Sequence, residues 1–168
     1  MKQRLMVFLF CVIFFVSGNS FATKLNSLPQ LQIIVLLSSA AQKKLSKYNE
    51  EITISTNWYG FPLLQKEMLA DESGQIKLSA STFNIPLEER VISLNPSKLE
   101  AQRLTWLKDG VYVNVNIYSA RKHWPDNILA CDFVDGRLVE VARNPVILRC
   151  SLITEHQHSK VVENSDQH

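Results

Sequence analysis

Short segments in which apolar and polar residues alternate recur along this chain, and they constrain its fold more than any other feature. The clearest example runs from Val111 to Tyr118, where valine or isoleucine alternates with tyrosine or asparagine. Successive side chains of a strand point to opposite faces, so this segment has one apolar and one polar face. The pattern predicts strands that cover one core on one side and meet solvent on the other.

Other runs, some alternating and some continuously apolar, predict further strands. They cover residues 31–37, 51–56, 75–78, 91–94, 104–108, 128–134, 137–141 and 145–153. Two-residue connections that contain glycine are typical of tight hairpins. We therefore expect Asp109-Gly110 to join 104–108 to 111–118, and Asp135-Gly136 to join 128–134 to 137–141. A turn is expected at 57–62 and another at 71–74.

One amphipathic helix is predicted from Ser39 to Tyr48. Ala41, Leu45 and Tyr48 recur at helical spacing, lysines occupy the other faces, and a serine precedes the helix as its cap. Between 95 and 107 a capped helix competes with a loop that leads into a strand, and we place the helix first and the strand after it. The expected fold class is mainly β, a single antiparallel β-sandwich or curved sheet with one or two short helices and one disulfide.

The first residues of the chain have the features of a secretory signal peptide. Lys2 and Arg4 precede an apolar run that ends at Val16, and Ser20 and Ala22 supply small residues before a cut. A membrane-spanning helix needs roughly 20 apolar residues, more than this run contains, so no stable membrane anchor is expected. The predicted organisation is a signal peptide at 1–22, a single β-rich domain at 23–153 and a disordered tail at 154–168.

Removal of the signal peptide leaves two cysteines, Cys131 and Cys150. In an oxidising compartment the default for such a pair is a disulfide. A short signal with early basic residues suits a bacterial envelope, so we expect a periplasmic or secreted protein. The two cysteines are also too far apart in sequence for a compact zinc motif.

Composition narrows the classes of ligand. Without Lys2 and Arg4, the 18 basic residues become 16 and equal the 16 acidic ones. A formally neutral chain without a long basic run does not suit binding to phosphate backbones, so no nucleic acid is expected as a partner. The sequence contains no glycine-rich phosphate loop and no metal-binding motif, and we expect neither a cofactor nor a metal.

Two clusters are candidates for binding. The first is a loop between two predicted strands, with cationic, aromatic and acidic side chains close together: Arg121, Lys122, His123, Trp124 and Asp126. Loops held by a rigid sheet often carry binding residues. The second is Trp58 and Tyr59, beside Gly60 and Phe61, where aromatic side chains at a turn would anchor a protein partner if exposed. The competing interpretations are a solvated turn for the first cluster and a cap on the core for the second.

These observations favour a noncatalytic periplasmic binding module with a protein partner in the envelope, such as an enzyme inhibitor or an immunity-type protein. One alternative is an envelope hydrolase acting on peptidoglycan or polysaccharide. It would use His123 with Asp126 and a distant carboxylate such as Glu88 or Glu89. A structural protein of the envelope is the other alternative.

Overall fold

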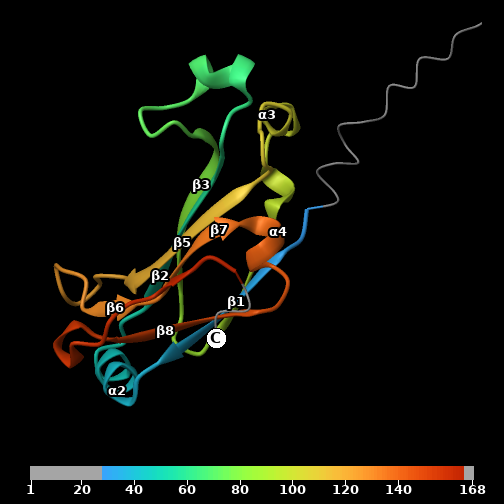
Figure 1. Ribbon diagram of the computed structural model, residues 1–168. Coiled ribbons are helices and arrows are strands. Elements are labelled where there is room, and N and C mark those ends of the chain that lie inside the picture. Colours follow the sequence, from blue (N-terminus) through green and yellow to red (C-terminus); the bar gives the residue numbers. More distant parts are fainter. Residues whose placement is uncertain (1–27, 165–168) are drawn as a thin grey trace, which may run out of the picture.

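The computed structural model describes residues 28–164, which form a mainly β fold of two mixed sheets and short helices (Figure 1). The first sheet contains, in spatial order, β4 (Val91–Leu94), β1 (Leu31–Leu37), β8 (Val146–Leu152) and β6 (Leu129–Cys131). The second contains β3 (Ile76–Ile85), β2 (Ile52–Gly60), β5 (Tyr112–Ser119), β7 (Phe133–Arg137) and β9 (Val161–Val162). The predicted signal peptide lies outside the described residues.

Helical segments connect the strands. They are α2 (Ser39–Lys47), α3 (Ala101–Leu104), α4 (Leu138–Val141) and the 3-10 turns η1 (Leu64–Leu69), η2 (Pro96–Lys98) and η3 (Ile153–Glu155). The helix predicted at 39–48 is confirmed as α2, and the Ser38 hydroxyl accepts a hydrogen bond from the Ala41 N–H at 3.1 Å. Asn95 caps η2 in the same way, with Pro96 in the first position, which confirms the helical interpretation of that segment.

The inward faces of both sheets contribute to one hydrophobic core. Val113 and Val115 of β5 are fully buried, and so are Ile52 and Ile54 of β2. In β1, alternate residues from Leu31 to Val35 are buried as well. Period-two alternation in the sequence therefore predicted the apolar faces of β2 and β5 correctly. Five of the strand pairs are antiparallel, while β1 with β8 and β7 with β9 are parallel.

The hairpin predicted across Asp109-Gly110 is wrong. Gly110 does form a turn with a φ of 90°, but residues 104–108 before it form no strand. Leu104 ends α3, and Trp106 donates a backbone hydrogen bond to the Arg103 carbonyl at 3.0 Å. Leu104 and Leu107 are both buried, a spacing of three that suits a helical turn and would point to opposite faces in a strand.

The hairpin predicted across Asp135-Gly136 is also wrong, because both residues lie within β7 and α4 follows directly. Gly136 is required there by close packing. A Cβ at this position would lie 2.4 Å from the carbonyl oxygen of Glu163, which follows β9. The glycine thus admits a neighbouring segment and does not mark a turn.

The tail predicted to be disordered from residue 154 has structure over much of its described part. β9 pairs in parallel with β7, and Val162 is buried against the core. β9 contains only Val161 and Val162, so it is too short to be recognised from an alternation of apolar and polar residues. The position of β9 depends on its pairing with β7, which would otherwise be the edge strand of this sheet.

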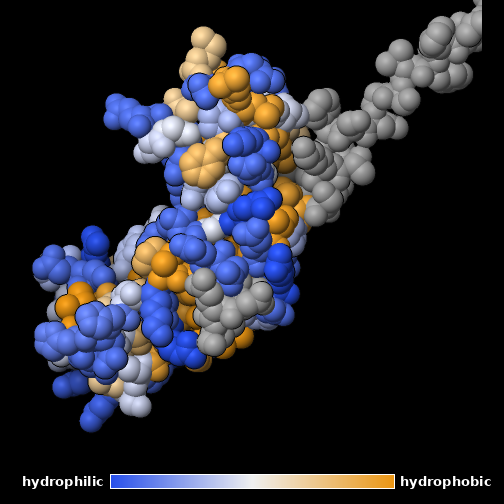
Figure 2. All heavy atoms as spheres, viewed as in Figure 1, coloured by the Kyte–Doolittle hydropathy of each residue, from blue (hydrophilic) through white to orange (hydrophobic). Residues whose placement is uncertain are grey.

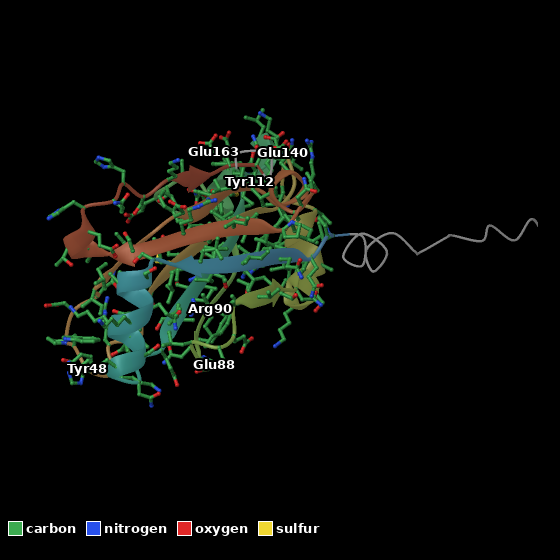
Figure 3. All side chains as sticks on the ribbon, turned by 90° about the horizontal axis from the view of Figure 1, so that it is seen from below. Tyr48, Glu88, Arg90, Tyr112, Glu140 and Glu163 are labelled. Atoms are coloured by element: carbon green, nitrogen blue, oxygen red, sulfur yellow. A yellow bond between two sulfur atoms is a disulfide. The ribbon has the colours of Figure 1, made fainter. Side chains whose placement is uncertain are left out.

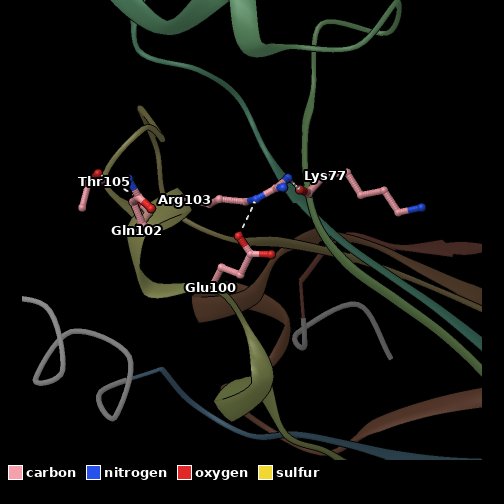
Figure 4. A network of polar contacts seen from close by, with 5 residues as sticks. All are labelled: Lys77, Glu100, Gln102, Arg103 and Thr105. Carbon is pink, nitrogen blue, oxygen red and sulfur yellow. Dashed lines mark hydrogen bonds and ion pairs between the residues drawn. The ribbon is translucent and has the colours of Figure 1, made fainter.

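The outer edge of the second sheet is partly covered by α3. The Arg103 Nη1 donates to the Lys77 carbonyl of β3 at 2.8 Å, while Arg103 Nε pairs with Glu100 at 2.8 Å (Figure 4). An exposed strand edge invites pairing with other chains, and a side chain on a free carbonyl reduces that tendency. This contact fixes α3 against β3.

The predicted disulfide between Cys131 and Cys150 is confirmed. The two residues are direct partners in the antiparallel pair of β6 and β8, with sulfurs 2.06 Å apart. The bond closes a loop with a sequence separation of 19 residues. It ties the short edge strand β6 to the centre of its sheet.

Reduction of this bond is expected to lower the free energy of unfolding by about 3 kcal/mol, because a loop of this length regains its entropy in the unfolded chain. Urea denaturation with and without dithiothreitol measures the difference. A double variant, Cys131→Ala with Cys150→Ala, is the control and should not respond to the reductant. Equal stability of the oxidised and reduced protein would contradict the prediction.

Candidate functional site

The predicted binding residues from Arg121 to Asp126 lie in a loop, residues 120–127, that follows β5. The loop lies beside the C-terminal end of α2 at one end of the sandwich (Figure 1). Ring contacts and cation–π contacts connect the two segments. We call the combined surface the cationic aromatic patch, which consists of Lys44, Lys47, Tyr48, Arg121, Lys122, His123 and Trp124.

The end of α2 places a carboxylate beneath this loop. Asn49 adopts a left-handed conformation with a φ of 49°, which asparagine tolerates better than most residues. The N–H of Glu50 then bonds to the Leu45 carbonyl at 3.0 Å and the N–H of Asn49 to that of Ser46 at 3.3 Å. This is the Schellman arrangement that ends many helices. It turns Glu50 inward, where the residue is only 1% exposed.

The Glu50 carboxylate holds the loop by its backbone. Its two oxygens accept the N–H groups of Lys122, at 3.0 Å, and His123, at 2.8 Å. Arg121 just before them has a φ of 59°, so the consecutive N–H groups form a small anion-binding concavity. These two bonds satisfy a buried charge and fix the middle of the loop.

A second set of hydrogen bonds fixes the base of the loop. The Asn127 Oδ1 accepts the backbone N–H groups of Ser119 and Leu129, both at 3.0 Å. Its Nδ2 donates to the Leu129 carbonyl at 2.7 Å, and the buried Ser119 hydroxyl accepts the N–H of Ile128 at 3.0 Å. The loop is therefore anchored at its centre and at its base.

Three rings meet above the anchored backbone. The Tyr48 ring centroid lies 4.4 Å from that of His123 and 5.0 Å from that of Trp124. His123 and Trp124 are 4.7 Å apart and nearly perpendicular. Tyr48 is 40% exposed, and His123 is exposed as well, so the group forms part of the surface.

Two lysines lie against these rings, and the loop itself contributes two further cations. The Lys44 Nζ lies 5.2 Å from the Trp124 ring, and Lys47 Nζ lies 5.3 Å from the Tyr48 ring. The Arg121 guanidinium carbon lies 5.5 Å from the centroid of the Tyr118 ring. Lys122 Nζ forms an ion pair with Glu51 Oε1 at 2.5 Å. Cation–π contacts at exposed sites contribute only about 0.5–1 kcal/mol, but they orient the cations around the aromatic centre.

The second predicted cluster is not on the surface. β2 continues to Gly60 instead of turning at 57, so Trp58 and Tyr59 are strand residues that are 5% and 7% exposed. The prediction that they anchor a partner is therefore wrong for an intact fold. Both neighbours of β2, namely β3 and β5, pair with this segment, which explains why the polar Asn57 does not end the strand.

Tyr59 instead makes a buried polar contact. Its hydroxyl donates to Asp135 Oδ1 at 2.6 Å, and its ring stacks on Tyr112 with centroids 5.5 Å apart. Burial, followed by the hydrogen bond to Asp135, raises the pKa of the Tyr59 hydroxyl well above its ordinary value of 10.0. Figure 3 shows Tyr112 on the side of the molecule opposite Tyr48, so this cluster is separate from the cationic aromatic patch.

The residues considered for hydrolysis are not assembled. Among residues 28–164, no hydrogen bond or ion pair joins the His123 ring to Asp126, Glu88 or Glu89. Glu88 and Glu89 are exposed in the turn between β3 and β4, and Figure 3 shows Glu88 near Arg90 and apart from Tyr48. Within the same range, no group of three or more His, Cys, Asp and Glu side chains is placed to hold a metal ion.

Sequence reasoning missed part of the patch. Lys44, Lys47 and Glu50 were not linked to the loop, since contacts separated by more than 70 residues leave no local pattern. It also missed η1, which projects from the opposite end with Leu64 79% and Met68 89% exposed. Figures 1 and 2 show this segment at the top of the molecule, with hydrophobic residues among hydrophilic ones.

Substitution Glu50→Gln is expected to loosen the loop. A neutral amide accepts through one oxygen only, so one loop N–H loses its partner and the other loses a charged acceptor. We expect unfolding free energy to fall by about 1–3 kcal/mol in urea titrations, with faster hydrogen exchange at Lys122 and His123. Glu51→Gln, which removes a surface ion pair, should cost less than about 1 kcal/mol. Equal losses in both variants would contradict the anchoring role of Glu50.

Tyr59 is expected to make stability fall at alkaline pH. Above pH 10 the unfolded chain releases the Tyr59 proton while the folded protein retains it, because the folded-state pKa is raised. The deprotonated form therefore favours unfolding, and no such effect exists below pH 10. Urea midpoints at pH 9 and 11 should differ less in Tyr59→Phe than in wild type. A variant whose alkaline loss matches that of wild type would refute this assignment.

Comparisons with known proteins do not indicate a function for this chain. No protein-family model matches the chain, and neither the curated proteins nor the solved structures contain a match. Within residues 28–164, none of the helices has the length and apolar character needed to span a bilayer.

Proposed function

We propose that this protein is an exported, noncatalytic binding module of the bacterial envelope. It captures a protein partner with the cationic aromatic patch, in the manner of an enzyme inhibitor or an immunity-type protein that covers part of its target. The observation that carries this proposal is the double anchoring of loop 120–127, by Glu50 at its centre and by Asn127 at its base. A loop ordered before binding loses less entropy when a partner docks.

The residue types in the patch suit recognition of a protein. Trp, Tyr and Arg are the side chains that most often dominate protein interfaces, because they bury large areas with few rotatable bonds. Tyr48 and Trp124 lie against His123, and Arg121 belongs to the same loop as His123 and Trp124. They form a candidate centre for an interface.

The charge of the patch specifies the kind of partner. The patch contains four cations, Lys44, Lys47, Arg121 and Lys122, and of these only Lys122 makes an ion pair among the described residues. A partner with an acidic surface would supply the missing counter-charges and be attracted at long range. The expected partner is therefore an acidic envelope protein.

Export is supported by two independent features. The N-terminal residues have the signal-peptide pattern, and the Cys131–Cys150 bond is typical of oxidising compartments. The hydrolase alternative gains no support, since no hydrogen bond or ion pair joins the groups that it would use among residues 28–164. A structural role in the envelope is compatible with the same patch, and the partner's identity would distinguish the two.

A triple variant tests the proposal: Arg121→Ala, His123→Ala and Trp124→Ala. Wild type and variant are immobilised and exposed to envelope extract, and the retained acidic protein is purified and its Kd measured by calorimetry. We expect Kd to rise at least about tenfold in the triple variant, the loss of about 1.4 kcal/mol of binding free energy. Wild-type affinity should fall as salt is raised.

The control variant also replaces three side chains, one apolar and two cationic, at the opposite end of the sandwich: Leu64→Ala, Lys66→Ala and Lys108→Ala. It should bind like wild type, and all three proteins should melt within a few degrees of one another, because the replaced side chains are exposed or half-buried. Unchanged capture by the triple variant, or equal loss in the control, would remove the patch from consideration.

A further inference from the structure

A cavity of about 580 Å³ lies on the outer face of the four-stranded sheet and shares no residue with the cationic aromatic patch. Its volume is in the range of small-molecule sites, about 300–1,000 Å³. Leu36 and Arg149 are direct partners on β1 and β8, and Ala130 and Ser151 are partners on β6 and β8. These four residues line the cavity from the sheet. We call residues 155–160 the strap, and all of them except His156 line the cavity as well.

Two carboxylates fix the strap at its ends. The Glu155 Oε2 accepts the Ser38 hydroxyl and the Leu152 N–H, both at 2.7 Å. At the other end, Asp132 accepts the N–H of Lys160 through Oδ1 at 2.8 Å and the N–H of Arg149 through Oδ2 at 3.1 Å. Hydrogen bonds therefore fix the strap in place on its side of the cavity.

Three residues with side-chain donors also line the cavity: Arg149, Ser151 and Lys160. Among residues 28–164 neither the Arg149 guanidinium nor the Lys160 ammonium makes an ion pair. Ser151 is only 6% exposed, and its hydroxyl has no hydrogen-bond partner in the described part of the chain. A buried hydroxyl without a partner is unfavourable, so an acceptor brought by a ligand would relieve this cost.

We propose that this cavity binds a small monocarboxylate with a short aliphatic part. The ligand carboxylate accepts from Arg149, Lys160 and Ser151, and the aliphatic part packs against Leu36 and Ala130. A single negative charge fits best, because Asp132 and Glu155 would repel a dianion. The hydrogen bonds from Ser38 and the Leu152 N–H also lower the pKa of the Glu155 carboxyl, which keeps it charged at neutral pH. This site is independent of the proposed protein-binding function.

The test uses the oxidised protein and octanoate as the probe, followed by amide chemical shifts and calorimetry. We expect saturable one-site binding that shifts the amide signals of Ser151 and Lys160. Octanamide, which lacks the charge, acetate, which lacks the aliphatic part, and inorganic phosphate should each bind at least about tenfold more weakly.

Variants separate this site from nonspecific binding. Arg149→Ala should weaken octanoate about tenfold or more, and Ser151→Ala about fivefold, without lowering the stability of the free protein. Lys108→Ala, at the far end of the molecule, should bind like wild type. Absence of saturable binding, equal binding of octanamide, displacement of octanoate by phosphate, or unchanged affinity in Arg149→Ala would each overturn the proposal.

Discussion

The Glu50 carboxylate, seated on the backbone N–H groups of Lys122 and His123, is the contact on which the proposed recognition surface depends. A buried charge without donors would be strongly unfavourable, so the loop must keep this conformation for Glu50 to remain inside. The left-handed Asn49, which follows α2, turns the carboxylate of Glu50 inward, and the positive φ of Arg121 turns the N–H groups toward it. This anchored backbone determines where the aromatic and cationic side chains of the loop lie.

Carboxylates that accept backbone N–H groups recur wherever this fold must hold an irregular segment. Asp132 and Glu155 fix the strap in the way that Glu50 fixes loop 120–127. The ion pairs of Arg103, Lys122 and Arg137 are partly exposed, and such pairs contribute little to stability. Directed hydrogen bonds to the backbone thus do more than ion pairs to shape the loops of this molecule.

The candidate site was predictable in part. Arg121, His123 and Trp124 were identified because an unusual group of side chains joins two strand-like segments. Their partners Tyr48 and Glu50 were not, because the segment that follows α2 and contains them is more than 70 residues away in sequence. Trp58 and Tyr59 were misjudged for the opposite reason. Their polar neighbours suggested a turn, whereas pairing with β3 and β5 on both sides keeps β2 extended.

The sequence by itself determined the elements whose cause is local: the alternating face of β5, the serine cap of α2 and the availability of two cysteines for one bond. Only the tertiary structure decided how these elements pair. Gly136 lies within β7 because the Glu163 carbonyl occupies the space of a side chain, and Leu104 joins a helical turn because Leu107 shares its buried face. Periodicity and capping act over a few residues, while strand partners and close approaches arise between segments that only folding brings together.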